Sequence, residues 1–305
     1  MSDVAWIFPG QGSQKVGMGR DLVAEYSDAA EPFAVADDIL GFSLSDICWE
    51  GPDEALAYTR NQQPALLTTS IAMLNVLRAA SVVSQPAFLA GHSLGEYSAL
   101  VAGGALTFDD AVRLVRRRGE LMEEFGLGGM IAILGLDEEA AQLVASETGA
   151  EIANLNAPGQ ITLSGTDEAL AVAEMAANAR GARRVVRLPV NGAFHSSLMQ
   201  PVADELARDI ASTPIKALSA PLVSNVDAEL LTHPDDLRSE LVGHIVASVQ
   251  WIRVVETLLD NGATELIEIG PGAVLSSLNR RIDKSATTTT AEQLLSALGR
   301  PAEGK

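Results

Sequence analysis

Ser93 is the residue of this sequence whose surroundings most clearly indicate chemistry. It lies at the centre of Gly91-His92-Ser93-Leu94-Gly95, between a short apolar run and a predicted helix. This arrangement is a nucleophile elbow, a tight turn whose strained backbone excludes side chains two positions away on either side of the serine. The N–H groups that open the following helix can stabilise an oxyanion. The pattern predicts acyl transfer through Ser93; by itself it also fits a glycine-rich turn with a surface serine.

A serine hydroxyl needs a neighbouring base to act as a nucleophile. The sequence has four histidines, at positions 92, 195, 233 and 244. His92 lies inside the elbow, where its side chain should point away from Ser93. His195 stands at a junction between two predicted units, and such junctions carry function more often than helix faces do. We favour His195 as the base, with a structural or surface histidine as the alternative.

No carboxylate is clearly placed as a third catalytic residue. An α/β-hydrolase shows the chain order Ser, then Asp or Glu, then His. Most acidic residues between Ser93 and His195 fall in a predicted small unit rather than near the elbow. The sequence therefore favours a dyad, in which a main-chain or amide group orients the histidine.

The elements around the elbow indicate a large α/β unit. Short apolar runs predict strands at residues 4–8, 86–90, 221–225 and 265–269. Helices are predicted at residues 21–40 with an interruption near Pro32, from Pro64 to residue 77, and at residues 96–101, 109–125, 197–212 and 244–261. We expect an α/β fold whose large domain is α/β-hydrolase-like and has a parallel sheet.

A second unit begins after the glycine-rich segment Gly126-Leu127-Gly128-Gly129. The pattern there predicts strand, helix, strand, strand, helix and strand at residues 130–134, 137–147, 151–155, 160–164, 167–180 and 184–188. This βαββαβ order is that of a ferredoxin-like fold. We expect a small subdomain at residues 128–189, inserted into a large domain of residues 1–127 and 190–283, and a weakly ordered tail at residues 284–305.

Composition excludes several classes of function. The formal charge of −19 over 305 residues argues against a nucleic-acid partner and against an anionic membrane surface. No apolar run is long enough to span a bilayer, and the N-terminus does not resemble a signal peptide. The single cysteine, Cys48, permits no intrachain disulfide or CxxC pair, which is compatible with a reducing cytoplasm. We expect a cytoplasmic protein with no metal site.

Several further segments, taken in order, carry a resemblance to a known family. They are Phe8-Pro9-Gly10-Gln11-Gly12, Gln63-Pro64-Ala65, the elbow with Glu96-Tyr97, Arg118-Gly119, Asn156-Ala157-Pro158-Gly159-Gln160, Gly192-Ala193-Phe194-His195, Asn225-Val226, Val249-Gln250-Trp251 and Gly270-Pro271-Gly272. Over about residues 4–282 the chain resembles the malonyl-CoA:acyl-carrier-protein transacylases of type II fatty acid synthesis. It is also similar to the acyltransferase domains of polyketide synthases.

The resemblance implies a ping-pong reaction through Ser93. The serine would attack malonyl-CoA to form a malonyl ester, and the phosphopantetheine thiol of acyl carrier protein would then take the malonyl group. His195 would serve as base and then as acid. The main-chain N–H groups of Gln11 and Leu94 would form the oxyanion hole. Arg118 would bind the malonyl carboxylate, which a guanidinium holds better than an ammonium group does.

The resemblance also implies roles for residues around the dyad. Gln250 would orient His195 in place of a triad acid, and Gln63, Phe194 and Asn156 would line the pocket. Phe194 resembles the malonyl-selecting form of its motif, where methylmalonyl-selecting domains carry a smaller residue; one such contact shifts selectivity by about 1–3 kcal/mol. No bound cofactor is expected, because the phosphopantetheine belongs to the carrier.

Two positions depart from the family pattern. Ser197 and Ser248 stand where many relatives have proline. Neither change removes a reacting atom, but both affect loops that should hold His195 and Gln250. The alternatives at this point are an acyltransferase of a polyketide pathway, a serine esterase or thioesterase, and a catalytically silent relative that only docks.

Acyl carrier proteins are acidic, so an enzyme with this net charge should offer them a local basic patch. The clustered arginines that could supply the patch, or bind the phosphates of CoA, are Arg113, Arg116, Arg117, Arg180, Arg183, Arg184 and Arg187. Ordinary charge balance at the solvent surface is the alternative.

Overall fold

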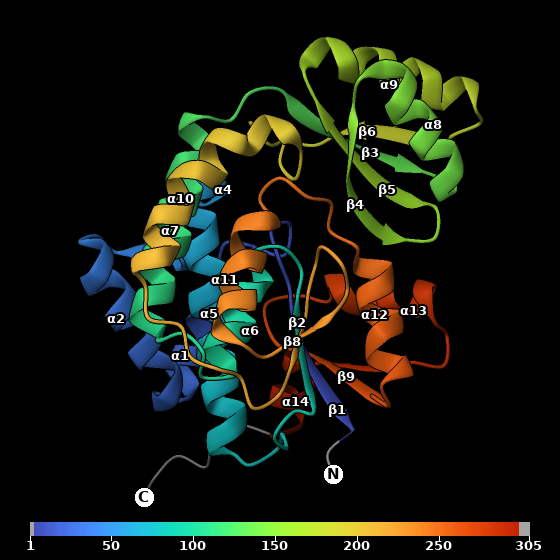
Figure 1. Cartoon of the computed structure of the whole chain (residues 1–305). Helices are drawn as coiled ribbons and strands as arrows, with labels where there is room; N and C mark the ends of the chain where they lie inside the picture. Colours follow the sequence, from blue (N-terminus) through green and yellow to red (C-terminus); the bar gives the residue numbers. More distant parts are fainter. Residues whose placement is uncertain (1–2, 299–305) are drawn as a thin grey trace, which may run out of the picture.

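A mainly parallel six-stranded sheet forms the centre of the molecule (Figure 1). The structure is a computed structural model and describes residues 3–298. The strand order is β10-β9-β1-β2-β7-β8, and only the pairing of β7 with β8 is antiparallel. The strands are β1 (Val4–Phe8), β2 (Phe88–Gly91), β7 (Leu222–Val223), β8 (Leu230–Leu231), β9 (Glu265–Glu268) and β10 (Thr287–Thr290).

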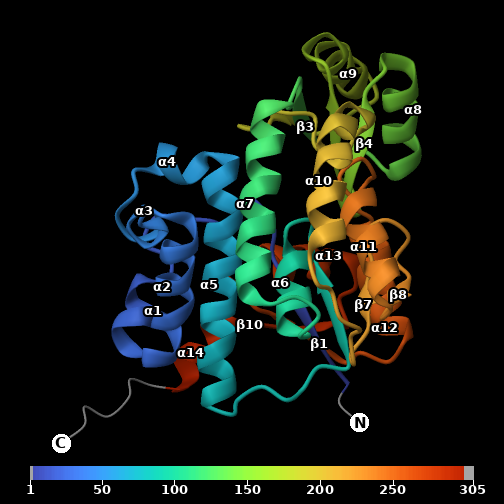
Figure 2. The same cartoon turned by 60° about the vertical axis from the view of Figure 1, so that its left-hand side comes forward.

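Helices cover both faces of this sheet (Figure 2). They are α1 (Arg20–Glu25), α2 (Ala30–Leu40), α3 (Leu44–Glu50), α4 (Asp53–Ala57), α5 (Thr59–Ala79), α6 (Gly95–Ala102), α7 (Phe108–Glu124), α10 (Gln200–Ser212), α11 (Pro234–Gly243), α12 (Trp251–Asp260), α13 (Val274–Ile282) and α14 (Ala291–Leu298), with the 3₁₀ turns η1 (Ser27–Ala29) and η2 (Ser197–Met199). Trp6 and Phe8 join the core shared with α5, α6 and α7, whereas Ala5 and Ile7 join the core shared with α12 and α13. Burial on both faces explains why β1 is apolar at every position.

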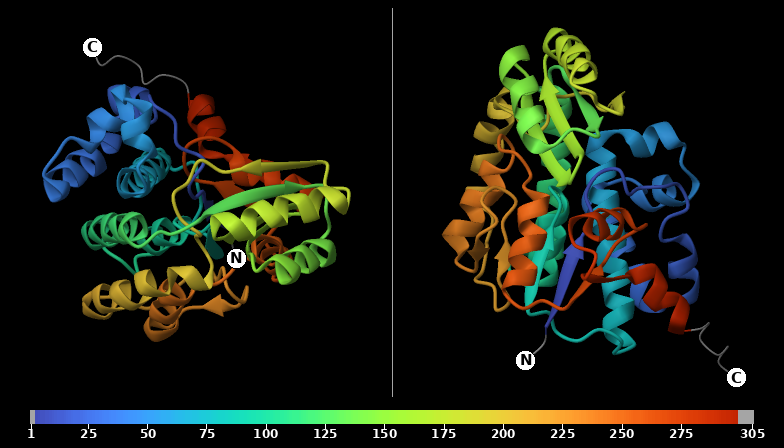
Figure 3. Two further views of the ribbon diagram at one scale, coloured as in Figure 1. Left: turned by 90° about the horizontal axis from the view of Figure 1, so that it is seen from above. Right: turned by 90° about the vertical axis from the view of Figure 1, so that its right-hand side faces the viewer.

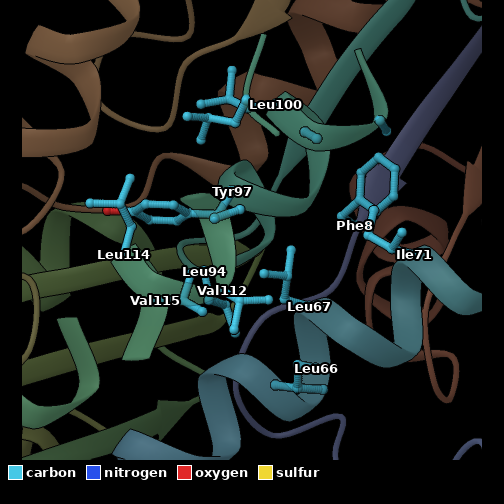
Figure 4. Packing of buried hydrophobic residues seen from close by; sticks show 14 of the residues in the cluster. Phe8, Leu66, Leu67, Ile71, Leu94, Tyr97, Leu100, Val112, Leu114 and Val115 are labelled. Carbon is cyan, nitrogen blue, oxygen red and sulfur yellow. The ribbon is translucent and has the colours of Figure 1, made fainter. Parts of the chain in front are cut away.

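Close packing fixes α6, the helix that follows Ser93. Leu94 and Tyr97 belong to the same core cluster as Val112 and Val115 of α7 and Leu67 of α5 (Figure 4). All five side chains are fully buried. The start of α6 therefore cannot move without disturbing both neighbouring helices.

A second, wholly antiparallel sheet lies at one end of the molecule (Figures 1 and 3). Its order is β4-β5-β3-β6, and its chain order is β3 (Gly129–Leu134), α8 (Glu138–Thr148), β4 (Glu151–Ala157), β5 (Gln160–Gly165), α9 (Asp167–Ala179) and β6 (Arg184–Arg187). Ile131 and Ile133 pack in a core with α8 and α9. Met130, which points the other way, joins the main core together with Phe194. One face of the small sheet thus carries its own helices, and the other rests on the large unit.

Two helix boundaries differ from those predicted at prolines. The break between α1 and α2 falls at Tyr26, and Pro32 lies in the first turn of α2, where its missing N–H costs nothing. Helix α5 begins at Thr59, with Pro64 inside it. Pro64 cannot donate to the carbonyl of Arg60, and Arg116 Nη1 donates to that carbonyl instead, at 3.2 Å. A long-range hydrogen bond therefore compensates for the proline.

The predicted helix at residues 244–261 is wrong in its first part. Helix α11 ends at Gly243 and α12 begins at Trp251, so residues 244–250 form an irregular segment. The carbonyls at the end of a helix have no intrahelical partner, so His244 can offer its carbonyl to another group.

The predicted weakly ordered tail is wrong for residues 287–298. Strand β10 pairs in parallel with β9, and Ala291 of α14 packs against Met73 and Leu77 of α5. Residues 299–305 lie outside the described part of the chain. Within residues 3–298, no helix combines the length and the apolar character needed to cross a membrane.

Candidate active site

Ser93 lies on a sterically closed turn between β2 and α6. Its φ is +52°, a left-handed conformation that residues other than glycine rarely adopt. A Cβ on Gly91 would lie 2.0 Å from the carbonyl carbon of Gly95, and one on Gly95 would lie 2.1 Å from the carbonyl oxygen of Phe8. Both neighbours must therefore be glycine, and the turn presents Ser93 at the carboxyl end of the central strands.

The Ser93 hydroxyl has two side-chain partners. Its Oγ is 2.8 Å from Nε2 of His195 and accepts a hydrogen bond of 3.0 Å from Nη2 of Arg118. All three side chains are buried, with exposed fractions of 8%, 6% and 0% for Ser93, His195 and Arg118. The fold thus brings together three residues that are far apart in the sequence.

His195 is arranged as a neutral base. Its Nδ1 is 2.7 Å from the carbonyl oxygen of His244, which can only accept, so Nδ1 carries the proton and Nε2 is free to accept from Ser93. Burial, the charge of Arg118 and nearby His244 hold the pKa of His195 well below 6.5. The imidazole is therefore unprotonated at neutral pH and can take the proton of the serine.

Arg118 presents unused donors beside the nucleophile. It lies on α7 and is fully buried, and its Nε and Nη1 have no hydrogen-bond partner among residues 3–298. The neighbouring arginines behave differently. Arg116 donates to Glu120 at 2.6 Å, and Arg117 lies 3.5 Å from Asp209. Only one member of the arginine run thus faces the site.

Comparison with known proteins identifies related acyltransferases. The family model described as "Acyl transferase domain" matches residues 5–304. A malonyl CoA-acyl carrier protein transacylase of Bacillus subtilis (strain 168) is 44% identical over 296 residues, which cover 94% of this chain and 93% of the relative. The crystal structure of an acyl carrier protein S-malonyltransferase from Vibrio cholerae superposes with a TM-score of 0.91 at 40% identity, covering 95% of this chain and 96% of that one.

The chain belongs to the malonyl CoA-acyl carrier protein transacylase family. A further structural relative is a malonyl-transacylase in complex with a type II PKS acyl-carrier protein. It has a TM-score of 0.94 and 38% identity, and the match covers 98% of this chain and 100% of that one. The mainly parallel sheet and the separate antiparallel sheet match the structures of this transacylase family.

The role predicted for Gln250 from the family resemblance is wrong. The group that engages Nδ1 of His195 is the main-chain carbonyl of His244. Gln250 instead donates its own N–H to the carbonyl of Asn225 at 2.8 Å, and its Oε1 is buried without a partner in the described part of the chain. His244 is not identified from the sequence, because a helix is predicted to run through it. In addition, any type of residue can supply a main-chain acceptor, so the residue type gives no signal.

The predicted oxyanion donors lie next to the elbow. A Cβ on Gly10 would lie 2.4 Å from the carbonyl oxygen of His92, so the loop after β1 passes against the turn. The main-chain N–H groups of Gln11 and Leu94 have no acceptor among residues 3–298. They are therefore available to a ligand, as the transacylase resemblance implies.

The three predicted pocket residues have distinct surroundings. Gln63 of α5 is buried, and its Nε2 lies 3.2 Å from Sδ of Met122. Phe194 is buried next to the base, and its carbonyl accepts from Ser164 at 2.5 Å. Asn156 of β4 lies 2.8 Å from Nε2 of His92, so it connects the small sheet to the outer side of the elbow.

Asn225 is a site residue for which no role is predicted from the sequence. Its Oδ1 accepts from the N–H of Ser93 at 2.7 Å, and its Nδ2 donates to the carbonyl of Gly91 at 2.6 Å. The residue lies just after β7, the strand next to β2. The signal that could have found it is the polar pair Ser224-Asn225, which ends the predicted strand at residues 221–225.

Most arginines of the predicted carrier patch are already paired. Arg180 binds Glu147, Arg187 binds Asp167, and Arg113 lies 4.0 Å from Asp110. Arg183 and Arg184, at the start of the edge strand β6, have no ion pair within residues 3–298. These two are the members of the set most available to an acidic partner.

Proposed function

We propose that this protein transfers a malonyl group from malonyl-CoA to the phosphopantetheine thiol of an acyl carrier protein, through an ester on Ser93. Relatives that are 44% and 43% identical carry the name malonyl CoA-acyl carrier protein transacylase. A structural relative is in complex with a carrier protein of a type II polyketide synthase. These names support the reaction class, and the choice of acyl group rests on the site itself.

The observation that carries the proposal is Arg118. A fully buried guanidinium with two nitrogens that have no partner within residues 3–298 is costly to the folded protein unless a ligand uses it. Its Nη2 lies 3.0 Å from Ser93 Oγ, so a group that binds the guanidinium lies beside the reacting carbonyl. A carboxylate accepts two parallel hydrogen bonds from arginine. Malonyl has such a carboxylate next to its thioester, and acetyl does not.

In the proposed first half-reaction, Ser93 Oγ attacks the thioester carbonyl while Nε2 of His195 takes the hydroxyl proton. The N–H groups of Leu94 and Gln11 hold the oxyanion of the tetrahedral intermediate. The carbon–sulfur bond then breaks, and the imidazolium gives its proton to the sulfur of CoA. In the second half-reaction His195 takes the proton of the carrier thiol, the thiolate attacks the ester, and Ser93 recovers its proton.

The finer description of the fold also belongs to this proposal. The βαββαβ order and the strand order β4-β5-β3-β6 support a ferredoxin-like subdomain at residues 128–189. The parallel strands and the elbow at the end of β2 support an α/β-hydrolase-like large domain of residues 1–127 and 190–283. The single buried thiol, Cys48, supports a cytoplasmic location.

The test is acyl-enzyme formation measured by intact mass, with malonyl-CoA and acetyl-CoA in competition. The wild-type protein should gain one malonyl group, and Ser93→Ala should gain none. Arg118→Ala should lower the rate of malonylation at least about 100-fold, because each hydrogen bond to a charged group contributes about 1.5–3 kcal/mol. The rate of acetylation should fall far less. Arg117→Ala is the matched control and should behave as wild type.

Two results would overturn the proposal. Unchanged malonylation in Arg118→Ala removes the carboxylate site. A malonyl-enzyme that reacts with water and not with holo-carrier protein identifies an esterase. Parallel transfer assays with a fatty-acid carrier and a polyketide carrier then decide which pathway the enzyme serves.

A further inference from the structure

A buried ionisable cluster lies behind the catalytic residues. Glu96 comes from α6, Glu240 from α11 and His244 from the segment after α11. Their exposed fractions are 0%, 7% and 0%. The mechanism above uses the carbonyl of His244 but none of the three side chains. Such a group needs a reason to be in a core, because burying charge is costly.

The cluster holds the partners of both catalytic residues. Oε1 of Glu96 accepts from the N–H of Asn225 at 2.9 Å, and Oε1 of Glu240 accepts from the same N–H at 2.8 Å. Asn225 in turn holds the N–H of Ser93. Oε2 of Glu96 lies 2.6 Å from Nδ1 of His244, whose carbonyl holds His195. Two hydrogen-bonded connections therefore start at the two carboxyl groups. One leads through Asn225 to Ser93, and the other leads through His244 to His195.

The geometry favours a proton within the cluster. Oε1 of Glu96 and Oε1 of Glu240 accept from the same N–H, so the two carboxyl groups lie close together, and two ionised carboxylates at that separation would repel each other strongly in the core. Burial raises the pKa of both glutamates to about 8 and lowers that of His244 to about 3. The other titratable groups that face the pair are Arg118 of α7 and Tyr97 of α6. At neutral pH the two glutamates therefore do not both carry a charge, and His244 is neutral.

A metal ion is a poorer explanation of the same cluster. One ligand atom from each of the three residues lies within 4.8 Å of the others. However, the N–H groups of Asn225 and Val226 both point at Oε1 of Glu240, at 2.8 and 3.1 Å. Donors aimed at a carboxylate oxygen occupy the positions that a cation would need. A shared proton satisfies these contacts and a cation does not.

We propose that Glu240 is a positioning residue, which shares one proton with Glu96 and thereby fixes Asn225 and His244 under Ser93 and His195. The inference rests on the proposed function only in that one of its two measurements uses malonyl transfer. Loss of the shared proton places two negative charges side by side in the core. The contacts to Asn225 and His244 then separate, and the dyad loses its alignment. The folded pKa values are raised, so the stabilisation by the cluster is complete below pH 4.5 and is lost as the pH rises through about 8.

The experiment compares Glu240→Gln and Glu240→Leu with the wild-type protein from about pH 6 to about pH 9.5. One readout is the rate at which a fluorophosphonate labels Ser93, which needs the dyad but no malonyl-CoA. The other is the kcat and KM of malonyl transfer. Gln at position 240 keeps the acceptor for Asn225 and donates to Glu96 as the protonated acid would, but it cannot ionise. Leu removes the acceptor.

The matched control is Glu268→Gln. Glu268 is a second buried glutamate, whose carboxyl oxygens accept from the N–H groups of Leu275 and Ser276 at the start of α13. Burial raises its pKa as well. Substitution there removes a buried carboxyl group with no such connection to the dyad, so it should lower the denaturation midpoint and leave the pH profile of labelling as in wild type.

The wild-type labelling rate should decline as the pH rises through about 8, and this decline should be absent in Glu240→Gln and present in Glu268→Gln. Glu240→Leu should lower kcat about 10-fold or more and change KM by less than about twofold. The inference is overturned if the labelling rate of the wild-type protein does not decline with rising pH, or if the decline persists in Glu240→Gln. Both outcomes can be read even when Glu240→Leu does not fold. The protein could show the expected labelling profiles and yet transfer no malonyl group. That result would reject the proposed function but would still support the positioning role of Glu240.

Discussion

Ser93 and His195 lie 2.8 Å apart, yet the molecule holds them in different ways. The turn at Ser93 is closed mainly by main-chain sterics, because neither Gly91, which meets Gly95, nor Gly95, which meets the carbonyl of Phe8 on β1, can carry a side chain. His195 is fixed by distant groups. Its ring binds the carbonyl of His244, 49 residues away, and the preceding carbonyl binds Ser164, 30 residues before Phe194. A nucleophile can thus be read from a local motif, whereas its base depends on the assembled fold.

The two regions meet at the small sheet. Strand β4 pairs with the segment that carries His244, through Leu155 N–H to the carbonyl of Val249 and Val249 N–H to the carbonyl of Ala153, both at 2.9 Å. Asn156 of the same strand contacts the elbow at His92. The small sheet therefore positions the base side directly and touches the nucleophile side only at its edge. This contrast predicts that substitutions in the elbow abolish activity, whereas substitutions around His195 each reduce it only partly.

The largest effect is expected for Gly95→Ala. The new methyl group would lie 2.1 Å from a main-chain oxygen of β1, a central strand that cannot shift. We expect at least a 1,000-fold loss of fluorophosphonate labelling, since removal of aligned catalytic groups has effects of about this size. Gly129→Ala is the control, because a Cβ there meets its nearest neighbours at 3.7 Å, an ordinary contact. A labelling rate near that of wild type in Gly95→Ala would show that the elbow is not sterically closed.

Asn225→Ala should have the next largest effect. It leaves the buried N–H of Ser93 and the carbonyl of Gly91 without their partner, and each such group costs about 1–3 kcal/mol. The expected result is a 10- to 100-fold lower labelling rate, together with a lower midpoint of urea denaturation. Asn178→Ala, an exposed asparagine on α9, serves as the control. If the denaturation midpoint falls while the labelling rate does not, Asn225 stabilises the fold without positioning Ser93.

The same contrast explains what could be predicted from the sequence. Strand β1 and the elbow follow from adjacent residues, an apolar run ended by Pro9 and paired glycines around Ser93, and both are where the pattern places them. A main-chain group is one of the two kinds of partner predicted for His195, but its identity as the carbonyl of His244 could not be predicted, because a helix end exposes it. Strand β10 was missed because its run of threonines, Thr287–Thr290, becomes a strand only by pairing with β9.

The pH dependence of the labelling rate tests how the fold controls His195. Burial first, and then the charge of Arg118, hold the pKa of His195 well below 6.5. The labelling rate should therefore stay level as the pH falls through 6.5 and decline only below it. The unfolded chain binds this proton first, so the contribution of His195 to stability is present above pH 6.5 and is lost as the pH falls toward its folded pKa.

Arg118→Ala supplies the matching variant for this profile. Without the guanidinium the pKa of His195 should rise toward 6.5, and the acid decline should move to higher pH. The fluorophosphonate carries no carboxylate, so the shift can be measured apart from malonyl binding. An acid decline at the same pH in both proteins would mean that burial alone lowers the pKa.

The smallest effect is expected for Glu151→Ala, which removes a contact to Ser197, two residues after His195. Ser197 donates its N–H and its hydroxyl Oγ–H to the carboxylate of Glu151 on β4, at 3.0 and 2.5 Å. A proline at this position, which the family resemblance implies for many relatives, could make neither bond. Exposed contacts of this kind contribute about 0–1 kcal/mol, and His244 and Ser164 hold the same segment, so Glu151→Ala should lower the labelling rate by about twofold. In a Ser197→Pro background the same substitution should have no further effect, because its partner is gone. Equal losses from Glu151→Ala in both backgrounds would show that Glu151 acts on the base through some contact other than Ser197.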